Sequence, residues 1–206
     1  MFHEAELRHS DGLLHSRRAD GFTSRSGSGI LDSMTLSLEA LANWEAAVLA
    51  RISGARGTPD ERDAQITRSG LYAEYPAIIR SYFDAEGPES ETWLEVIKRT
   101  VFLVWHSFKA LPVDSGISEV AESTVRDVFA ALDHMIGNGN ADEELRSMLA
   151  WYRDSFPEPF DTYGPVRNLD AFIRDVSTED ALEQLRESQF DGRGQLGMYW
   201  SALLGS

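Results

Sequence analysis

Apolar side chains recur every three or four residues along most of this sequence, and this spacing restricts its fold more than any other feature. Between residues 94 and 108 they stand at Leu94, Ile97, Val101, Val104 and Phe108. Such spacing places side chains on one face of an α-helix, whereas a half-buried strand would alternate with period two. No stretch alternates in a way that requires a strand. The sequence therefore predicts an all-α fold.

The helices are expected to form one bundle-like domain of about eight helices. The helix over residues 89–110 is apolar on nearly every side near its middle, which is typical of a central helix buried by its neighbours. Residues 59–82 are expected as one helix interrupted at Gly70. The predicted helices cover residues 31–51, 59–82, 89–110, 115–136, 140–156, 166–175, 178–187 and 196–204.

Several helix ends carry local signals. Thr58-Pro59-Asp60-Glu61 combines a capping threonine, proline at the first helical position and glutamate at the third. We expect Asn140 to cap the helix that follows it. Gly137 is expected to end the preceding helix in the left-handed conformation. Residues 156–165, which are rich in proline and aromatic side chains, are expected to form a connection between helices.

The chain is strongly acidic, with a formal net charge of -15 from 34 acidic and 19 basic residues. Residues 1–30 carry four of each kind, so the whole excess lies in residues 31–206. Residues 1–30 are also poor in apolar side chains, which predicts a disordered N-terminal arm before a single helical domain over 31–206. An acidic domain repels nucleic acid and anionic lipid surfaces and attracts basic partners.

The sequence excludes several kinds of chemistry. The chain has no cysteine, so it forms no disulfides, thiolate metal sites or cysteine nucleophiles. It has no His-Glu-x-x-His, G-x-S-x-G or phosphate-binding G-x-x-x-x-G-K motif. We therefore expect neither a metal ion nor a cofactor, and a non-enzyme is favoured. No run of about 18 apolar residues and no signal-peptide pattern occurs, which predicts a cytoplasmic protein without a membrane-spanning helix.

One glycine-rich segment near the end of the sequence matches a known nucleotide-binding pattern. Gly192-Arg193-Gly194-Gln195-Leu196-Gly197 matches the dinucleotide-binding pattern G-x-G-x-x-G. That pattern functions when a strand precedes it and a second strand follows with an acidic residue about 20 positions further on. Here a helix is predicted before the motif, and only nine residues follow it. We interpret the match as accidental and the segment as a hinge that docks the last helix.

Two groups of residues are candidates for a functional site. The first is a pocket between helices at Arg99, His106 and Tyr152, because helical bundles hold ligand sites between facing helices. The second is a partner-binding surface with aromatic side chains near a proline-rich connection. It comprises Trp151, Phe156, Phe160 and Tyr163. The alternative interpretation of the second group is that these rings fix the connection to the domain.

These observations leave three hypotheses. The first is a protein-binding module for a basic protein, as inhibitor and immunity proteins are. The second is a small-molecule-binding protein or enzyme with an interhelical pocket near His106 and Tyr152. The third is a homo-oligomer that assembles through the C-terminal helix over 196–204, whose expected apolar face includes Trp200 and Leu203.

Overall fold

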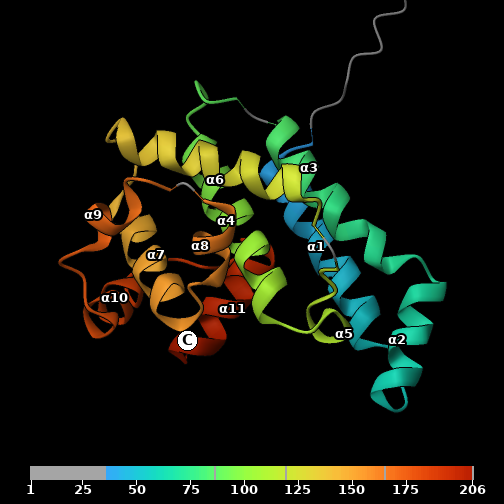
Figure 1. Cartoon of the computed structure of the whole chain (residues 1–206). Helices are drawn as coiled ribbons and strands as arrows, with labels where there is room; N and C mark the ends of the chain where they lie inside the picture. Colours follow the sequence, from blue (N-terminus) through green and yellow to red (C-terminus); the bar gives the residue numbers. More distant parts are fainter. Residues whose placement is uncertain (1–35, 86, 119, 165, 206) are drawn as a thin grey trace, which may run out of the picture. The chain divides into compact units, whose positions relative to one another are not determined.

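The chain folds into helices throughout the part that the computed structural model describes, which is residues 36–85, 87–118, 120–164 and 166–205. Over these residues there are eleven α-helices and one short 3-10 helix, η1, with no strand (Figure 1). The all-α prediction is confirmed, and eight of the helices have seven residues or more. The elements are α1 Leu38–Ser53, α2 Pro59–Arg68, η1 Leu71–Ala73, α3 Glu74–Ala85, α4 Trp93–Lys109, α5 Pro112–Ser115, α6 Glu122–Gly137, α7 Glu143–Ser155, α8 Glu158–Tyr163, α9 Leu169–Ile173, α10 Thr178–Leu185 and α11 Gly194–Leu204.

The described residues belong to one compact unit. The predicted arm, residues 1–30, lies outside the described residues, so this boundary stays a prediction. Over the described residues no helix has the length and the apolar character needed to cross a membrane.

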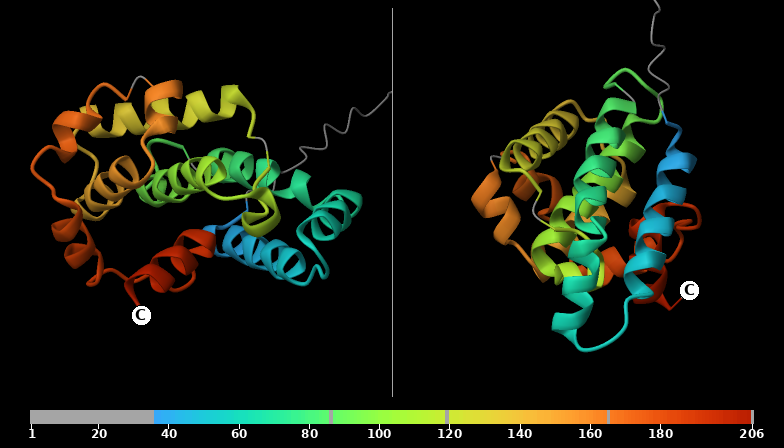
Figure 2. Two further views of the ribbon diagram at one scale, coloured as in Figure 1. Left: turned by 60° about the horizontal axis from the view of Figure 1, so that its bottom comes forward. Right: turned by 90° about the vertical axis from the view of Figure 1, so that its right-hand side faces the viewer.

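Helix α4 is the central element, as its apolar pattern predicts. Every side chain from Val96 to Trp105 is buried. Figure 2 shows α4 between α6 on one side and the pair α1 and α11 on the other. Buried apolar side chains from each of these helices belong to one hydrophobic cluster. Since burial of apolar surface is the main driving force for folding, α4 is the element around which the others are held.

The strongest local signals of the sequence form as predicted. Thr58 accepts from the backbone N–H of Glu61, and the Glu61 carboxylate accepts from the backbone N–H of Thr58, which completes the capping box of α2. Gly70 takes the left-handed conformation with φ of 71° and separates α2 from η1. Ser177 caps α10.

Helix α6 begins later than predicted. The prediction placed its start at 115, but residues Pro112–Ser115 form the separate helix α5 and α6 starts at Glu122. Gly116 ends α5 in the left-handed conformation, with φ of 75°. A Cβ atom at Gly116 would collide with the side chain of Ile52, so the close approach of α1 also requires glycine here.

The predicted signals between α6 and α7 were wrong by two residues each. Gly139 rather than Gly137 takes the left-handed conformation, with φ of 70°. Asn140 does not cap α7, because its backbone N–H donates to the carbonyl oxygen of Met135 and closes the end of α6. Asp142 is the cap, and its Oδ1 accepts from the backbone N–H of Leu145 at 2.8 Å.

The connection predicted over residues 156–165 contains a short helix. Pro159 lies in the first turn of α8, where its missing N–H costs no helical hydrogen bond. Phe160 is buried and its ring stacks on that of Phe129 in α6, with 5.2 Å between the centroids. Helix α8 is therefore fixed against α6, and Figure 1 shows the two close together.

Candidate functional site

A carboxylate lies inside the core. Glu45 of α1 has an exposed fraction of 1%. Its Oε1 accepts from the hydroxyl of Tyr82 at 2.5 Å, and its Oε2 accepts from the backbone N–H of Gln195 at 2.9 Å. The Tyr82 hydroxyl accepts from Arg99 Nη1 at 3.2 Å, and Gln195 Nε2 donates to the Tyr75 hydroxyl at 2.8 Å. We call these five residues the Glu45 cluster.

The environment of Glu45 changes its acidity. Burial raises the pKa of Glu45 to about 7, against the opposite effects of the hydrogen bonds from Tyr82 and Gln195 and the charge of Arg99. A carboxyl group that titrates near neutrality is typical of catalytic acids and bases. Here, however, both oxygens are occupied by groups of the chain itself. The hydrogen bond to Gln195 joins α1 to the first turn of α11, and we assign Glu45 this structural role.

Close contacts require glycine at two positions of the glycine motif, and one of these contacts is with the Glu45 cluster. Gly194 has φ of 62°, and a Cβ atom there would lie 2.6 Å from Glu45 Cδ. A Cβ atom at Gly197 would collide with the carbonyl oxygen of Phe190. Two glycines of the motif thus permit close packing of the chain on itself. No strand precedes the motif over the described residues, and the interpretation as a docking segment for α11 agrees with these contacts.

An ion network continues from the same segment. Arg193 forms a bidentate ion pair with Glu95 of α4: its Nε donates to Oε1 at 2.8 Å and its Nη2 donates to Oε2 at 2.6 Å. Its Nη2 also lies 2.8 Å from Glu144 Oε1 of α7, which in turn lies 2.9 Å from Lys98 Nζ. Burial by itself raises the pKa of Glu144, but the Arg193 and Lys98 charges hold it below its usual range. The network joins α4, α7 and the start of α11.

The residues predicted for an interhelical pocket are divided between two environments. Arg99 belongs to the Glu45 cluster, where its Nε also donates to Glu95 at 2.6 Å. His106 and Tyr152 instead share an aromatic cluster, because the ring of Phe102 stands 5.1 Å from that of His106 and 6.3 Å from that of Tyr152. The structure therefore brings His106 and Tyr152 together and leaves Arg99 outside their cluster.

The aromatic cluster provides little for acid–base chemistry. Burial, together with the charge of Lys109, lowers the pKa of His106 to about 4, and its Nδ1 is buried without a hydrogen-bond partner. The Tyr152 hydroxyl is fully buried and accepts from Trp200 Nε1 at 3.2 Å. A neutral histidine and a buried phenol held by an indole are typical of a packed interior. The small-molecule hypothesis for these residues stays a prediction.

Trp151 lies apart from the other members of the predicted aromatic surface. Its Nε1 donates to the Tyr199 hydroxyl at 2.9 Å, and its ring is 6.3 Å from that of Trp200 in α11. Lys109 Nζ lies 4.6 Å from the centroid of the Trp105 ring and 5.9 Å from that of Trp151, within reach of a cation–π interaction. Trp151 therefore belongs to the interface between α7 and α11.

Phe156, Phe160 and Tyr163 occur in or beside α8, but their roles differ. Phe156 is partly buried against the core, and its carbonyl oxygen accepts from Trp105 Nε1 at 3.1 Å. Phe160 is buried, as described above. Tyr163 packs its ring against that of Phe108 of α4, 5.2 Å away, and also lines an open hollow. All three side chains thus pack against the domain, and Tyr163 in addition borders the hollow.

The hollow beside Tyr163 has a volume of about 610 Å³. We call it the Tyr163 groove. Its polar lining is Ser107, Ser118 and Glu122. The apolar lining consists of Phe108, Pro112, Ile117, Val120, Ala121 and Tyr163. The exposed side chain of Leu111 directly precedes the lining residue Pro112. A hollow of this size and composition is suited to one or two apolar side chains of a partner.

Sequence reasoning missed Glu45 and the groove, although a signal for Glu45 was present. Leu41, Glu45, Val48 and Ile52 follow one another at intervals of four, three and four, so Glu45 occupies a buried position of an amphipathic helix. The groove had no comparable signal, because its lining comes from α4, α5, α6 and α8 and their connections.

No group of three or more histidine, aspartate or glutamate side chains within the described ranges is arranged to hold a metal ion. Comparisons with models of protein families, with curated proteins and with solved structures find no match for this chain. The Glu45 cluster and the aromatic cluster lie in the interior, each with one buried polar atom that has no hydrogen-bond partner in the described part of the chain, Gln195 Oε1 and His106 Nδ1. The Tyr163 groove instead presents apolar surface to solvent.

Proposed function

We propose that this chain is a protein-binding module, and that the Tyr163 groove holds an apolar side chain of a basic partner. The observation that carries the proposal is the groove itself, which has apolar walls and a volume of about 610 Å³. Leu111, with an exposed fraction of 67%, directly precedes the lining residue Pro112. Interfaces draw most of their affinity from a large side chain seated in such a pocket within a polar rim.

The charge of the chain supports a basic partner. Its net charge is -15, and two carboxylates lie in or near the groove, Glu122 in the lining and Asp114 two residues after Pro112. Both form exposed ion pairs, Glu122 with Arg126 and Asp114 with Arg62. Exposed pairs contribute about 0–1 kcal/mol, so a lysine or arginine of a partner can replace them at little cost. Complementary charge would also speed association at low salt.

A selection from a random peptide library tests this proposal without a known partner. Peptides selected on the full chain are expected to share a leucine or aromatic residue flanked by lysine or arginine. The affinity of a selected peptide, measured by fluorescence anisotropy, should fall as salt is raised. The variant Leu111→Ser should weaken binding by roughly tenfold, the equivalent of one lost apolar contact.

The matched control is Leu203→Ser, because Leu203 is also an exposed leucine but lies on α11. Circular dichroism should show both variants folded. Selected peptides without a basic residue, or peptides that bind Leu111→Ser as tightly as the original chain, would contradict the proposal.

Self-association through α11 is the second candidate. Helix α11 exposes Met198, by 54%, and Leu203, by 41%. Five residues in a helix correspond to a rotation of about 140°, so these side chains do not share one face. Trp200 and Leu196 of the same helix are buried in the core, so truncation of α11 would unfold the chain. Light scattering on the double variant Met198→Ser, Leu203→Ser is the suitable measurement, and an unchanged mass would reject this candidate.

A further inference from the structure

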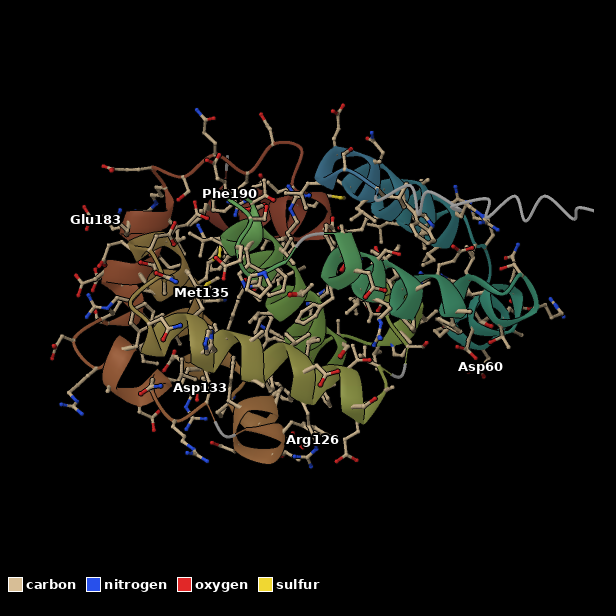
Figure 3. The ribbon with its side chains drawn as sticks, turned by 90° about the horizontal axis from the view of Figure 1, so that it is seen from above. Asp60, Arg126, Asp133, Met135, Glu183 and Phe190 are labelled. Atoms are coloured by element: carbon tan, nitrogen blue, oxygen red, sulfur yellow. The ribbon has the colours of Figure 1, made fainter. Side chains whose placement is uncertain are left out.

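A second hollow shares Tyr163 with the groove. It has a volume of about 380 Å³ and lies against α6, between Arg126 and His134, with Arg167 on the far side. Figure 3 labels Arg126 and Asp133 and shows α8 alongside the part of α6 between them. We call this hollow the arginine pocket. Its chemistry differs from that of the groove, because its rim carries nitrogen donors.

The positive groups of the arginine pocket are available for a ligand. Arg167 is exposed and forms no hydrogen bond or ion pair with any residue in the described part of the chain. Arg126 is paired with Glu122 across one turn of an exposed helix face, an interaction of small net value. The one carboxylate of the lining, Asp133, uses its Oδ1 to accept from the backbone N–H and Nδ2 of Asn168, at 3.0 Å and 3.2 Å.

That last contact also positions the pocket. Because Asp133 holds Asn168, it fixes the segment that carries the adjacent Arg167 against α6. Two guanidinium groups and the imidazole of His134 therefore surround a space with one carboxylate, which is already hydrogen-bonded. In a chain with a net charge of -15, two guanidinium groups beside one hydrogen-bonded carboxylate are contrary to the overall charge.

We propose that the arginine pocket binds a small organic oxyanion, a carboxylate or phosphate monoester attached to a compact aromatic group. Guanidinium groups match both oxyanions because their N–H donors form a planar fork. Tyr163 supplies an aromatic wall for the rest of the ligand, and the volume of about 380 Å³ lies within the range of small-molecule sites. This site is separate from the proposed function, because it requires no partner protein.

The experiment is an NMR titration of the full chain with three probes. Binding is monitored through the chemical shifts of the backbone and arginine side-chain N–H groups. The probes are phenyl phosphate, phenylacetate and inorganic phosphate. At least one organic probe is expected to shift the resonances of α6 and of residues 166–168 in a saturable way, and the comparison of the first two shows which oxyanion is preferred. Inorganic phosphate should bind at least about tenfold more weakly, since it lacks the apolar contact.

The variant Arg167→Gln should bind the preferred probe about tenfold more weakly or worse, because it loses a charge-assisted hydrogen bond. Arg186→Gln is the matched control, because Arg186 is another exposed arginine without an ion pair among the described residues, located in the cap of α10. It should bind the probe with unchanged affinity. Equal weakening by both variants would indicate non-specific attraction and overturn the proposal. Failure of both organic probes to give saturable shifts would overturn it as well.

Discussion

The N-terminus of α11 binds a carboxyl group, and that group is the side chain of Glu45 in the same protein. Backbone N–H groups at a helix N-terminus attract negative charge, which is why glycine-rich motifs bind phosphate there. In this chain the Glu45 carboxylate accepts from the N–H of Gln195, and Gly194 leaves the space for it. At the scale of single residues, the glycines of this motif are accounted for by contacts within the chain.

Two glycines of the motif should differ in their tolerance of a side chain. Gly192 and Gly194 both have positive φ, at 73° and 62°, but a Cβ atom at Gly192 would meet nothing within 4 Å. Gly192→Ala should therefore cost about 1–2 kcal/mol for the left-handed conformation alone. Gly194→Ala should cost at least about 2 kcal/mol more, because the methyl group would also displace the Glu45 carboxylate. Urea denaturation gives the free energy of unfolding of both variants, provided that the m value stays the same. Equal losses for the two variants would contradict the packing role of Gly194.

At the scale of helices, sequence patterns predicted the interiors of elements better than their ends. The apolar spacing identified α4 and α6, because each helix buries one continuous set of positions. The start of α6 was missed because the left-handed turn at Gly116 is required by its contact with Ile52, which is distant in sequence. Helix α8 was missed because six residues are too few to show a period.

The end of α6 and the start of α7 give a prediction at this scale. Asp142→Ala removes the cap of α7 and one of the two carboxylates within 3 Å of the buried Lys98 ammonium, which Glu144 alone then partners. We expect a loss of about 1–3 kcal/mol in the free energy of unfolding. Asn140→Ala is the matched control, because the structure uses only the backbone of Asn140, and it should cost less than about 0.5 kcal/mol. A larger cost at Asn140 than at Asp142, measured by urea denaturation, would reverse the assignment of the cap.

The candidate site was predictable only in part. The sequence placed Phe160 and Tyr163 near a surface because large aromatic residues stood beside prolines. It did not show which ring would be buried, because this depends on the position of Phe129 in α6. Trp151 is close to them in sequence, but its position on α7 places its ring against Trp200 of α11.

At the scale of the whole molecule, the polar interior joins the first described helix to the last. Gln195 lies 150 residues from Glu45, and Arg193 lies 98 residues from Glu95. Contacts over such distances close long loops, and closing a long loop costs more chain entropy than closing a short one. They also make the stability of the entire domain sensitive to the ionisation of one buried group, Glu45.

The direction of that sensitivity follows from the pKa of Glu45, which burial raises from 4.5 to about 7. Between these two pH values the folded chain holds a proton that the unfolded chain releases. The free energy of unfolding therefore decreases as pH rises through this window, by at most about 3 kcal/mol from this group. Glu144, whose pKa is lowered, has the opposite effect at lower pH, because its contribution is lost as pH falls.

The variant Glu45→Gln separates the pH effect of Glu45 from that of Glu144, because glutamine resembles the protonated carboxyl group at every pH. Near pH 5 the variant should differ little from the original chain, since Glu45 is then mostly neutral and both keep an oxygen for Tyr82 or the N–H of Gln195. By pH 8 the variant should have gained up to about 3 kcal/mol relative to the original, because no buried charge forms. Urea denaturation at pH 5, 6, 7 and 8 gives the difference directly. A difference that stays constant with pH would mean that Arg99 keeps Glu45 ionised throughout, and that the cluster is held by charge.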